Sequence, residues 1–320
     1  MWVIFVEFVC TNATKKDIDV ITSIKLVTMI DNVMDKKLSY EERKKIEDTI
    51  KKEIKENYMQ YQIIYVDKKR AGVYVTVPYK KGVMIDEIYL FEEFRNNGIG
   101  TKIINNIRNE YSFTYIWLYK DNKDMYRFLR RIGFMDYDVN NRILIMRIND
   151  IGPKIIKQME TIRNGFVDRR GNYYHKCKED FYDVYYLQKP QDLIESNVGL
   201  CFDQVELERF YLSKYDINLR TYYLIYQDGL LGPSHSFLIY KDNNKYYWLE
   251  NSWLKHRGIH EYESKESAFL DIANKFGKTI INFKKERLKL YEFEKPRYGT
   301  GYEKYKVNAF NGKVIKIFRG

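Results

Sequence analysis

Residues 94–102 read FRNNGIGTK, and this Gly-x-Gly stretch decides how the first half of the chain is organised. It follows an apolar, strand-like run, MIDEIYLF at 84–91, and precedes a segment whose apolar residues have helical spacing. Glycine lets a backbone approach a ligand closely, and a helix that starts here presents free N–H groups and the positive end of its dipole. The stretch therefore predicts either a turn that binds an anion such as a phosphate or an ordinary strand-to-helix turn.

The spacing of the glycines argues against two common nucleotide sites. A dinucleotide-binding fold needs GxGxxG within a βαβ unit, and a P-loop needs GK[ST] after its glycines. Residues 95–100 read R-x-x-G-x-G and match neither pattern. If the turn binds a phosphate, it therefore does so in another fold.

The hydrophobic pattern around this turn predicts a mixed α/β domain over 1–150. Ser39 and Glu42 have the spacing of a capping box, which marks the start of the second helix. The expected order is one strand, two helices, three strands, and then helix, strand, helix and strand. We expect strands at 1–10, 61–66, 71–79, 84–91, 113–119 and 142–148, and helices at 16–34, 39–58, 99–110 and 122–132.

Three features of this half occur together in one known family. They are the acidic strand IDEIYL, the R-x-x-G-x-G turn, and, after another strand, Asn122 followed by Gly133-Phe134. In their order and spacing, residues 1–150 resemble the GNAT family of acyl-CoA-dependent N-acetyltransferases. The resemblance implies a mixed central sheet flanked by helices. It also implies acetyl transfer from acetyl-CoA to an amine on a small molecule or a protein.

The resemblance also implies roles for particular residues. Ile88, Tyr89 and Leu90 would flank the pantetheine of acetyl-CoA, and Asn122 would contact the same arm of the cofactor. Glu87 would be the base that deprotonates the amine. The backbone of the turn would bind the pyrophosphate through Arg95, Asn96, Asn97, Gly98, Ile99, Gly100 and Thr101.

One position departs from the family pattern. The family commonly has a tyrosine four residues before the Gly-Phe glycine, where it acts as a general acid toward the thiolate. This chain has Leu129 there. Tyr126 lies one helical turn away, either as a substitute acid or as a packing residue. Binding of acyl-CoA is therefore the better supported half of the expectation.

The second half reads as an α+β domain. Gly152 and Pro153 mark a domain boundary after Asp150, which gives domains 1–150 and 151–320. The expected elements are helices at 154–163, from about Leu200 and at 265–276, strands at 221–227 and 236–253, the latter a hairpin around DNN, and further strand-like pieces up to 320.

A second candidate site begins in NVGLCFDQVELER at 197–209. Gly199 provides a break in regular structure, and Cys201 is at the start of the expected helix. The positive end of a helix dipole favours the thiolate form of such a cysteine. A nucleophilic cysteine also needs a base and a third group that orients the base.

The hairpin supplies candidates for both groups. Pairing around DNN places His235 opposite 250–252, so Glu250 or Asn251 comes close to the imidazole. A cysteine at a helix start, with histidine and a carboxylate or amide on neighbouring strands, is the arrangement of cysteine acyl-transfer enzymes. The alternative is a buried structural cysteine with an ordinary hairpin histidine.

Residues 196–253 are similar to the transglutaminase-like and papain-like cysteine enzymes. The matching pieces are GLC at the helix start, HSFLIY on a strand, and YYWLE, an apolar strand that ends in the acid Glu250. The resemblance implies Cys201 as nucleophile, His235 as base, and Glu250 or Asn251 as the orienting group. The nearby candidates for an oxyanion donor are Asn197, Gln204 and the backbone N–H of Cys201.

Composition limits the remaining functions. The net charge is +11 over 320 residues, with 26 basic and 22 acidic residues in 1–150 and 29 and 22 in 151–320. This even spread gives no basic tail, so nucleic acid is an unexpected partner. Cys10, Cys177 and Cys201 form no disulfide framework, which predicts a reducing, cytoplasmic location.

The sequence gives no reason to expect a membrane or a metal. The N-terminal run MWVIFVEFVC is about ten residues long and lacks a basic leader, so we expect a buried strand rather than a signal peptide. His256 and His260 are four residues apart, but Gly258 between them favours a loop over a helical metal site. We therefore predict no metal, and a two-domain acyl-transfer protein. The rival prediction is a catalytically degenerate protein of the same two folds that acts by recognition.

Overall fold

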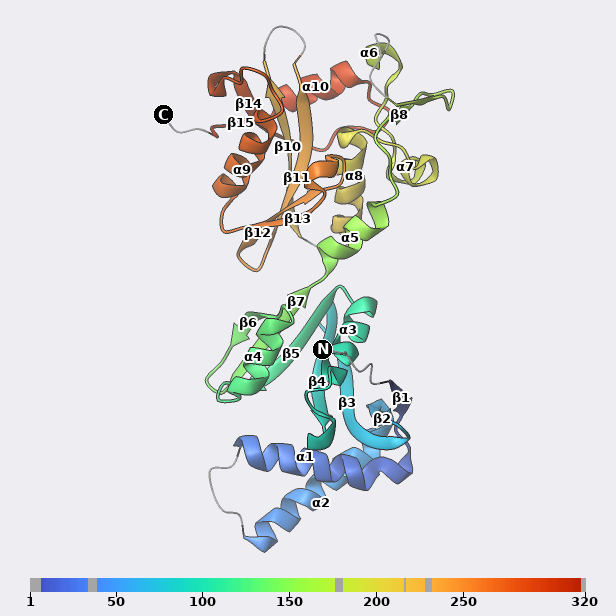
Figure 1. Ribbon diagram of the computed structural model, residues 1–320, viewed down its shortest axis with the longest axis vertical. Helices are drawn as coiled ribbons and strands as arrows, with labels where there is room; N and C mark the ends of the chain where they lie inside the picture. Colours follow the sequence, from blue (N-terminus) through green and yellow to red (C-terminus); the bar gives the residue numbers. More distant parts are fainter. Residues whose placement is uncertain (1–6, 34–38, 176–180, 216, 228–231, 318–320) are drawn as a thin grey trace. The chain divides into compact units, whose positions relative to one another are not determined.

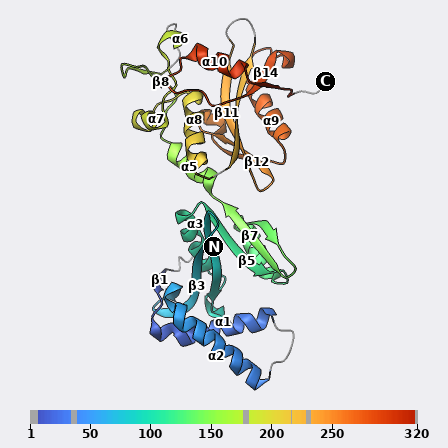
Figure 2. The same ribbon diagram turned by 180° about the vertical axis from the view of Figure 1, so that it is seen from behind.

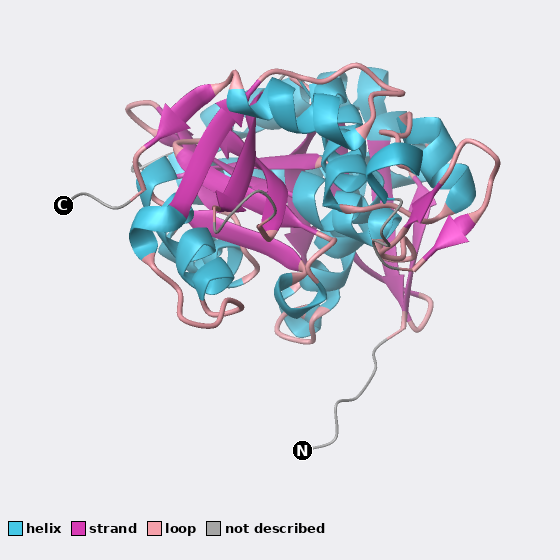
Figure 3. Cartoon of the chain, turned by 90° about the horizontal axis from the view of Figure 1, so that it is seen from above, coloured by secondary structure: helices cyan, strands magenta, loops and turns pink. Residues whose placement is uncertain are grey.

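The computed structural model describes residues 7–33, 39–175, 181–215, 217–227 and 232–317. The chain divides into two compact units, Met1–Asp150 and Ile151–Gly320 (Figure 1). Both units contain helices and strands, drawn in cyan and magenta in Figure 3.

The N-terminal unit is a mixed α/β domain built on one seven-stranded sheet. The strand order is β1-β2-β3-β4-β5-β7-β6, and only β4 and β5 run parallel. The strands are β1 (Phe8–Asn12), β2 (Tyr61–Val66), β3 (Lys69–Tyr79), β4 (Gly82–Leu90), β5 (Phe113–Tyr119), β6 (Met135–Val139) and β7 (Ile143–Asn149). The helices are α1 (Ile18–Val33), α2 (Tyr40–Asn57), α3 (Ile99–Glu110) and α4 (Lys123–Arg131).

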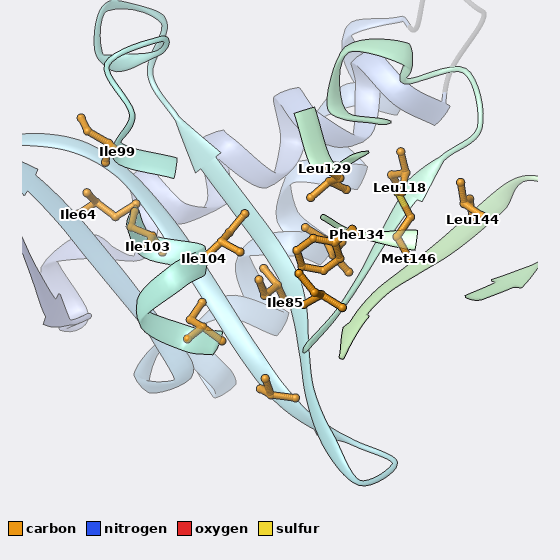
Figure 4. Packing of buried hydrophobic residues seen from close by; sticks show 14 of the residues in the cluster. Ile64, Ile85, Ile99, Ile103, Ile104, Leu118, Leu129, Phe134, Leu144 and Met146 are labelled. Atoms are coloured by element: carbon orange, nitrogen blue, oxygen red, sulfur yellow. The ribbon is translucent and has the colours of Figure 1, made fainter. Parts of the chain in front are cut away.

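Each face of this sheet is covered by one pair of helices because alternate strand residues point to opposite faces. On β2, Ile63 packs with α1 and α2, whereas the next residue, Ile64, packs with α3 and α4. Figure 4 shows the second of these clusters, in which Ile103, Leu129 and Phe134 meet the sheet residues.

The helices and most strands of this unit lie where the sequence predicts them. The Ser39–Glu42 capping box is confirmed, since each side chain bonds to the other residue's backbone N–H. The strand β6 was not predicted, because four of its five residues are exposed and it lacks an apolar pattern. The prediction of a buried first strand is wrong for Phe8–Asn12, which form a mostly exposed edge strand. Residues 1–6 lie outside the described part of the chain.

The C-terminal unit is an α+β domain with an antiparallel six-stranded sheet in the order β13-β12-β11-β10-β14-β15. Its strands are β10 (Asn218–Tyr226), β11 (Ser234–Asp242), β12 (Lys245–Glu250), β13 (Gly258–Tyr262), β14 (Leu288–Phe293) and β15 (Lys313–Ile315); β8 (Phe166–Val167) and β9 (Tyr173–Tyr174) pair separately. The helices are α5 (Ile151–Met159), α6 (Phe181–Val184), α7 (Pro190–Ser196), α8 (Cys201–Leu212), α9 (Lys265–Gly277) and α10 (Tyr302–Phe310).

Helices cover both faces of this sheet as well. The helix α9 packs on one face with Tyr222 and Phe237, and α8 and α10 pack on the other with Tyr223. Figure 2 shows α8 and α9 on opposite sides of the sheet. This arrangement brings the first turn of α8 to the strands β10 and β11.

Two predictions for this unit need correction, and one helix was missed. The first helix begins at Ile151 rather than 154, because Pro153 falls in the first turn, where a helix tolerates proline. Residues 302–310 are helical rather than extended, with Tyr302, Tyr305 and Ala309 buried on one face. The helix α7 was not predicted. The register of the DNN hairpin is confirmed, since Leu238 pairs with Leu249.

Among the described helices, none combines the length and the apolar character that a membrane span needs. Cys177 lies outside the described residues, and the other two cysteines are not in disulfides.

Candidate functional sites

The turn before α3 has the backbone conformation that its glycine allows. Gly98 is the N-cap of α3 and has a left-handed conformation, with φ of 76°. A Cβ atom at this position would meet no atom within 4 Å. Ile99 is buried in the core below and holds the turn in place. The turn is therefore anchored on its inner side and open above Gly98.

This turn also offers unused backbone donors. The first α-helical bond of α3 runs from Lys102 N to Gly98 O (3.0 Å). The N–H groups of Ile99, Gly100 and Thr101 precede it and so have no acceptor within the helix. Together with the helix dipole, these donors suit an anion such as a pyrophosphate. The residues present therefore fit the phosphates of acetyl-CoA.

Arg95 connects the turn to the end of β4. Its Nε donates to Leu90 O (2.8 Å), and its guanidinium lies over the ring of Tyr89. Asn96 and Asn97 are exposed. The side chain of Arg95 thus stabilises the turn, while the backbone that follows it faces outward.

A cleft opens beside this turn because β4 and β5 pair over only part of their length. Their parallel pairing ends at Ile85 and Ile116, although both strands continue beyond. A bulge at Asp86 shifts the register of β4 against β3 at the same place. The cleft has a volume of about 320 Å³ and is lined by Lys25, Thr28, Met29, Ile85, Asp86, Glu87, Ile88, Ile116, Trp117, Leu118, Tyr119, Asn122 and Met125.

Glu87, the predicted base, lies in this cleft. Burial raises the pKa of its carboxyl, although the nearby Lys25 and a hydrogen bond from Tyr61 Oη (3.2 Å) act in the opposite direction. A carboxylate whose pKa is raised is a better proton acceptor near neutral pH. Its neighbour Asp86 is exposed at the rim and accepts a bond from Trp117 Nε1 (3.0 Å).

The other predicted cofactor residues divide between two faces of β4. Ile88 lines the cleft, and Leu90 packs on the same face. Tyr89 points to the opposite face, toward the α1 and α2 core. Asn122 lines the cleft and caps α4, where its Oδ1 accepts from Met125 N (3.1 Å).

The position of the usual general acid is fully occupied by core packing. Leu129 is completely buried in the cluster of Figure 4, so it has no access to the cleft. Tyr126 packs against the same cluster and is not among the described residues that line the cleft. Tyr119, at the end of β5, does line it. The sequence shows Tyr119 only as a strand residue, because the divergence of β4 and β5 has no local signal.

In the C-terminal unit, Cys201, His235 and Glu250 come together. Cys201 is half-buried in the first turn of α8, and His235 Nε2 lies 2.7 Å from Glu250 Oε2. Burial by itself would lower the pKa of His235, but the Glu250 carboxylate and hydrogen bonds with Cys201 and Glu250 raise it to about 10. The imidazole thus interacts with both the thiol and a carboxylate.

Glu250 is held by three donors. Its Oε2 contacts His235, and its Oε1 accepts hydrogen bonds from Trp253 N (2.7 Å) and Ser252 Oγ (2.9 Å). Burial opposes the ionised form, but the charge of His235 and these hydrogen bonds lower the pKa of Glu250. The Trp253 ring packs against the imidazole at 5.5 Å between centroids. The carboxylate therefore orients His235 while remaining charged.

The turn before Cys201 depends on a residue that the sequence analysis missed. Asp203 Oδ2 accepts from Leu200 N (2.9 Å), and its Oδ1 accepts from Gln188 N (2.9 Å) and Tyr185 Oη (3.2 Å). Asp203 is almost fully buried, which raises its pKa to about 7. An acidic residue three positions after an N-cap was the available signal.

The candidates for an oxyanion donor need correction. Asn197 ends α7, and its Oδ1 accepts from Thr161 Oγ1 (3.0 Å). Gln204 is buried between Gly199 O (2.8 Å) and Asn251 Nδ2 (2.7 Å). The amide nitrogen of Gln204 is thus taken by a backbone carbonyl, whereas the contact of Asn197 uses only its oxygen. The side chain that contacts His235 is Glu250 rather than Asn251, and the backbone N–H of Cys201 remains a candidate donor.

The two later histidines lie on different elements of the C-terminal unit. His256 lies in a short 3₁₀ turn and His260 on β13, where its Nε2 bonds to His256 O (2.7 Å). In the described ranges, no three His, Cys, Asp or Glu side chains are grouped as metal ligands.

Part of the N-terminal unit matches a known protein family. Residues 28–134 match the model of the acetyltransferase (GNAT) family. These residues form a GNAT domain. They include the turn, α4 and every lining residue of the cleft except Lys25. The match does not extend into 151–320, so the transglutaminase-like character of the C-terminal unit stays a prediction.

Solved structures similar to the chain include three acetyltransferases. PaiA N-acetyltransferase from Thermoplasma acidophilum, in complex with coenzyme A, is 12% identical over 45% of this chain and 99% of its own, with a TM-score of 0.38. An N-acetyltransferase from Staphylococcus aureus Mu50 is 14% identical over 44% of this chain and 100% of its own, with a TM-score of 0.37. A GNAT-family acetyltransferase from Listeria monocytogenes is 14% identical over 45% of this chain and 95% of its own, with a TM-score of 0.32. No curated protein matches the chain by sequence. The family assignment depends on the matched residues 28–134 alone.

Proposed function

We propose that the N-terminal unit is an acetyl-CoA-dependent N-acetyltransferase. The observation that carries this proposal is the relation of two features at one end of β4. Glu87 lies in the cleft where β4 leaves β5, and the open turn at Gly98 follows the same strand. A donor whose phosphates bind at the turn can extend its arm along β4 into the cleft.

The chain's residues can divide the reaction as follows. Acetyl-CoA supplies an acetyl thioester, and the products are an N-acetyl amine and the free thiol. Glu87 accepts a proton from the acceptor ammonium, which makes the nitrogen nucleophilic. The N–C bond then forms as the C–S bond breaks, and the nitrogen's remaining excess proton passes to the leaving sulfur. Tyr119 is the hydroxyl on the β5 side of the cleft that can relay this proton.

The test is the pH dependence of acetyl transfer in wild type and Glu87→Gln. Because burial raises the pKa of Glu87, its basic form appears at a higher pH than that of an ordinary glutamate. We expect kcat/KM to rise with pH through that raised pKa, because Glu87 loses its proton there. Glu87→Gln should lower kcat/KM about 100-fold or more and remove this limb of the profile.

A matched control is Glu56→Gln, which makes the same change at an exposed position of α2. Release of free CoA thiol, followed with a chromogenic disulfide, separates turnover from binding. A protein that acts by recognition alone would bind acetyl-CoA and release no thiol with any amine tested. That result would replace this proposal with the binding function.

We further propose that the C-terminal unit attacks an amide or peptide carbonyl through Cys201. The contact between His235 and Glu250 supports this second function, together with the thiol of Cys201 that lies close enough to raise the pKa of His235. The Cys201 sulfur adds to the carbonyl, His235 transfers the thiol proton to the leaving amine, and a thioester forms as the C–N bond breaks. Water or a second amine then takes the acyl group, with hydrolysis and transfer as the respective outcomes.

A further inference from the structure

The cleft of the GNAT domain has an unequal distribution of charge. Among the described lining residues, Lys25 is the cation, and it is paired with Glu53 outside the cleft (2.6 Å). Asp86 is hydrogen-bonded to the neutral indole of Trp117. The rim therefore has one carboxylate without a cationic partner among these residues, beside the proton acceptor Glu87.

Most of the remaining lining is apolar or aromatic. Met29 on α1 and Ile116 on β5 contribute aliphatic surface. Trp117 and Tyr119 form an edge-to-face pair, with 5.4 Å between ring centroids. Such walls bind apolar groups and make unpaired charges unfavourable. The cleft has a volume of about 320 Å³, at the small end of ligand sites, and the proposed arm of acetyl-CoA takes up part of it, so the space left for the acceptor is small.

We propose that the acceptor is a primary monoamine with a compact apolar body and no carboxylate, of which phenethylamine is an example. This inference rests on the proposed acetyltransferase function. The ammonium lies at Asp86 and Glu87, and the apolar body packs against Met29 and Trp117. In the reaction, the nitrogen gives one proton to Glu87 and another to the leaving sulfur, and its bond to the acetyl carbon replaces the C–S bond.

The same residues disfavour two other classes of amine. An amino acid would bring its α-carboxylate close to Asp86, where like charges repel. A diamine or polyamine would bring a second cation against the apolar and aromatic lining, where an unpaired charge is unfavourable. A single cation with an apolar body meets neither penalty.

The experiment compares phenethylamine, phenylalanine and putrescine in two assays. Acetyl transfer is measured as kcat/KM, and amine binding is measured by calorimetry in the presence of CoA. We expect phenethylamine to exceed each of the others at least tenfold in both. Asp86→Asn should weaken phenethylamine binding about tenfold and leave acetyl-CoA binding unchanged. Asp48→Asn, the same change on the exposed surface of α2, should alter neither.

The outcomes separate this inference from the function on which it rests. Equal or better use of phenylalanine or putrescine would overturn the inference and leave the acetyltransferase in place. Asp86-dependent binding of phenethylamine without any acetylation would support the inference and overturn the acetyltransferase. Absence of phenethylamine binding, or binding that Asp86→Asn leaves unchanged, would overturn the inference in either case.

Discussion

Gly98→Glu is expected to reduce acetyl-CoA affinity on the order of 100-fold or more. Gly98 is the N-cap of α3, and the space where its Cβ would stand is open. A glutamate there would place a carboxylate over the N–H groups of Ile99, Gly100 and Thr101. Two unit charges 4 Å apart near a protein surface repel by about 4 kcal/mol, which is enough for this loss. Isothermal titration calorimetry of acetyl-CoA measures the effect.

Two variants control for the strain of a side chain at positive φ. Gly98→Asn keeps a residue that tolerates the left-handed conformation and adds no charge, so it should retain most of the binding. Gly171→Glu makes the same change at a glycine with φ of 84° and open space in the C-terminal unit, and should not affect acetyl-CoA. Undiminished affinity in folded Gly98→Glu would remove the assignment of the turn as the phosphate site.

The sequence predicts the elements of the GNAT domain well because their signals are local. The helix at 99–110 shows in the apolar spacing of Ile99, Ile103 and Ile107, and the structure has these bounds. The cleft has no such signal. It results from the early end of the β4–β5 pairing and from the bulge at Asp86, which are tertiary features. The presence of Tyr119 in the lining of the cleft was therefore not predictable from the sequence.

The C-terminal site was more accessible to sequence reasoning. A hairpin fixes its own register, so the turn at DNN brings His235 close to Glu250. Gln204 was misread because a polar side chain near the predicted nucleophile can equally hold the loop that carries it, as its bond to Gly199 O does. Asn251 shows the same ambiguity, since it bonds to Gln204 and to Met159 O. Only the partners of each amide distinguish the two roles.

Alkylation of Cys201 is expected to be much faster than alkylation of Cys10, and to depend on His235. An imidazolium beside a thiol favours the thiolate, which is the form that reacts with iodoacetamide. Cys10 is half-buried on β1, where burial raises its pKa despite a hydrogen bond with Tyr74, so little thiolate forms at neutral pH. In a Cys177→Ser background, mass spectrometry of the two tryptic peptides over a pH series gives both rates.

His235→Ala should lower the alkylation rate of Cys201 at pH 6.5 about 10- to 100-fold and leave the rate of Cys10 unchanged. His260→Ala is the matched control, because His260, on β13, bonds to the backbone carbonyl of His256 rather than to the thiol. Glu250→Gln should produce an intermediate loss, since it keeps the shape of the side chain but removes the charge that raises the pKa of His235. Equal rates for the two cysteines, or a Cys201 rate that survives His235→Ala in folded protein, would mean that the thiol is structural. The contact between His235 and Glu250 would then be a buried ion pair with a structural role only.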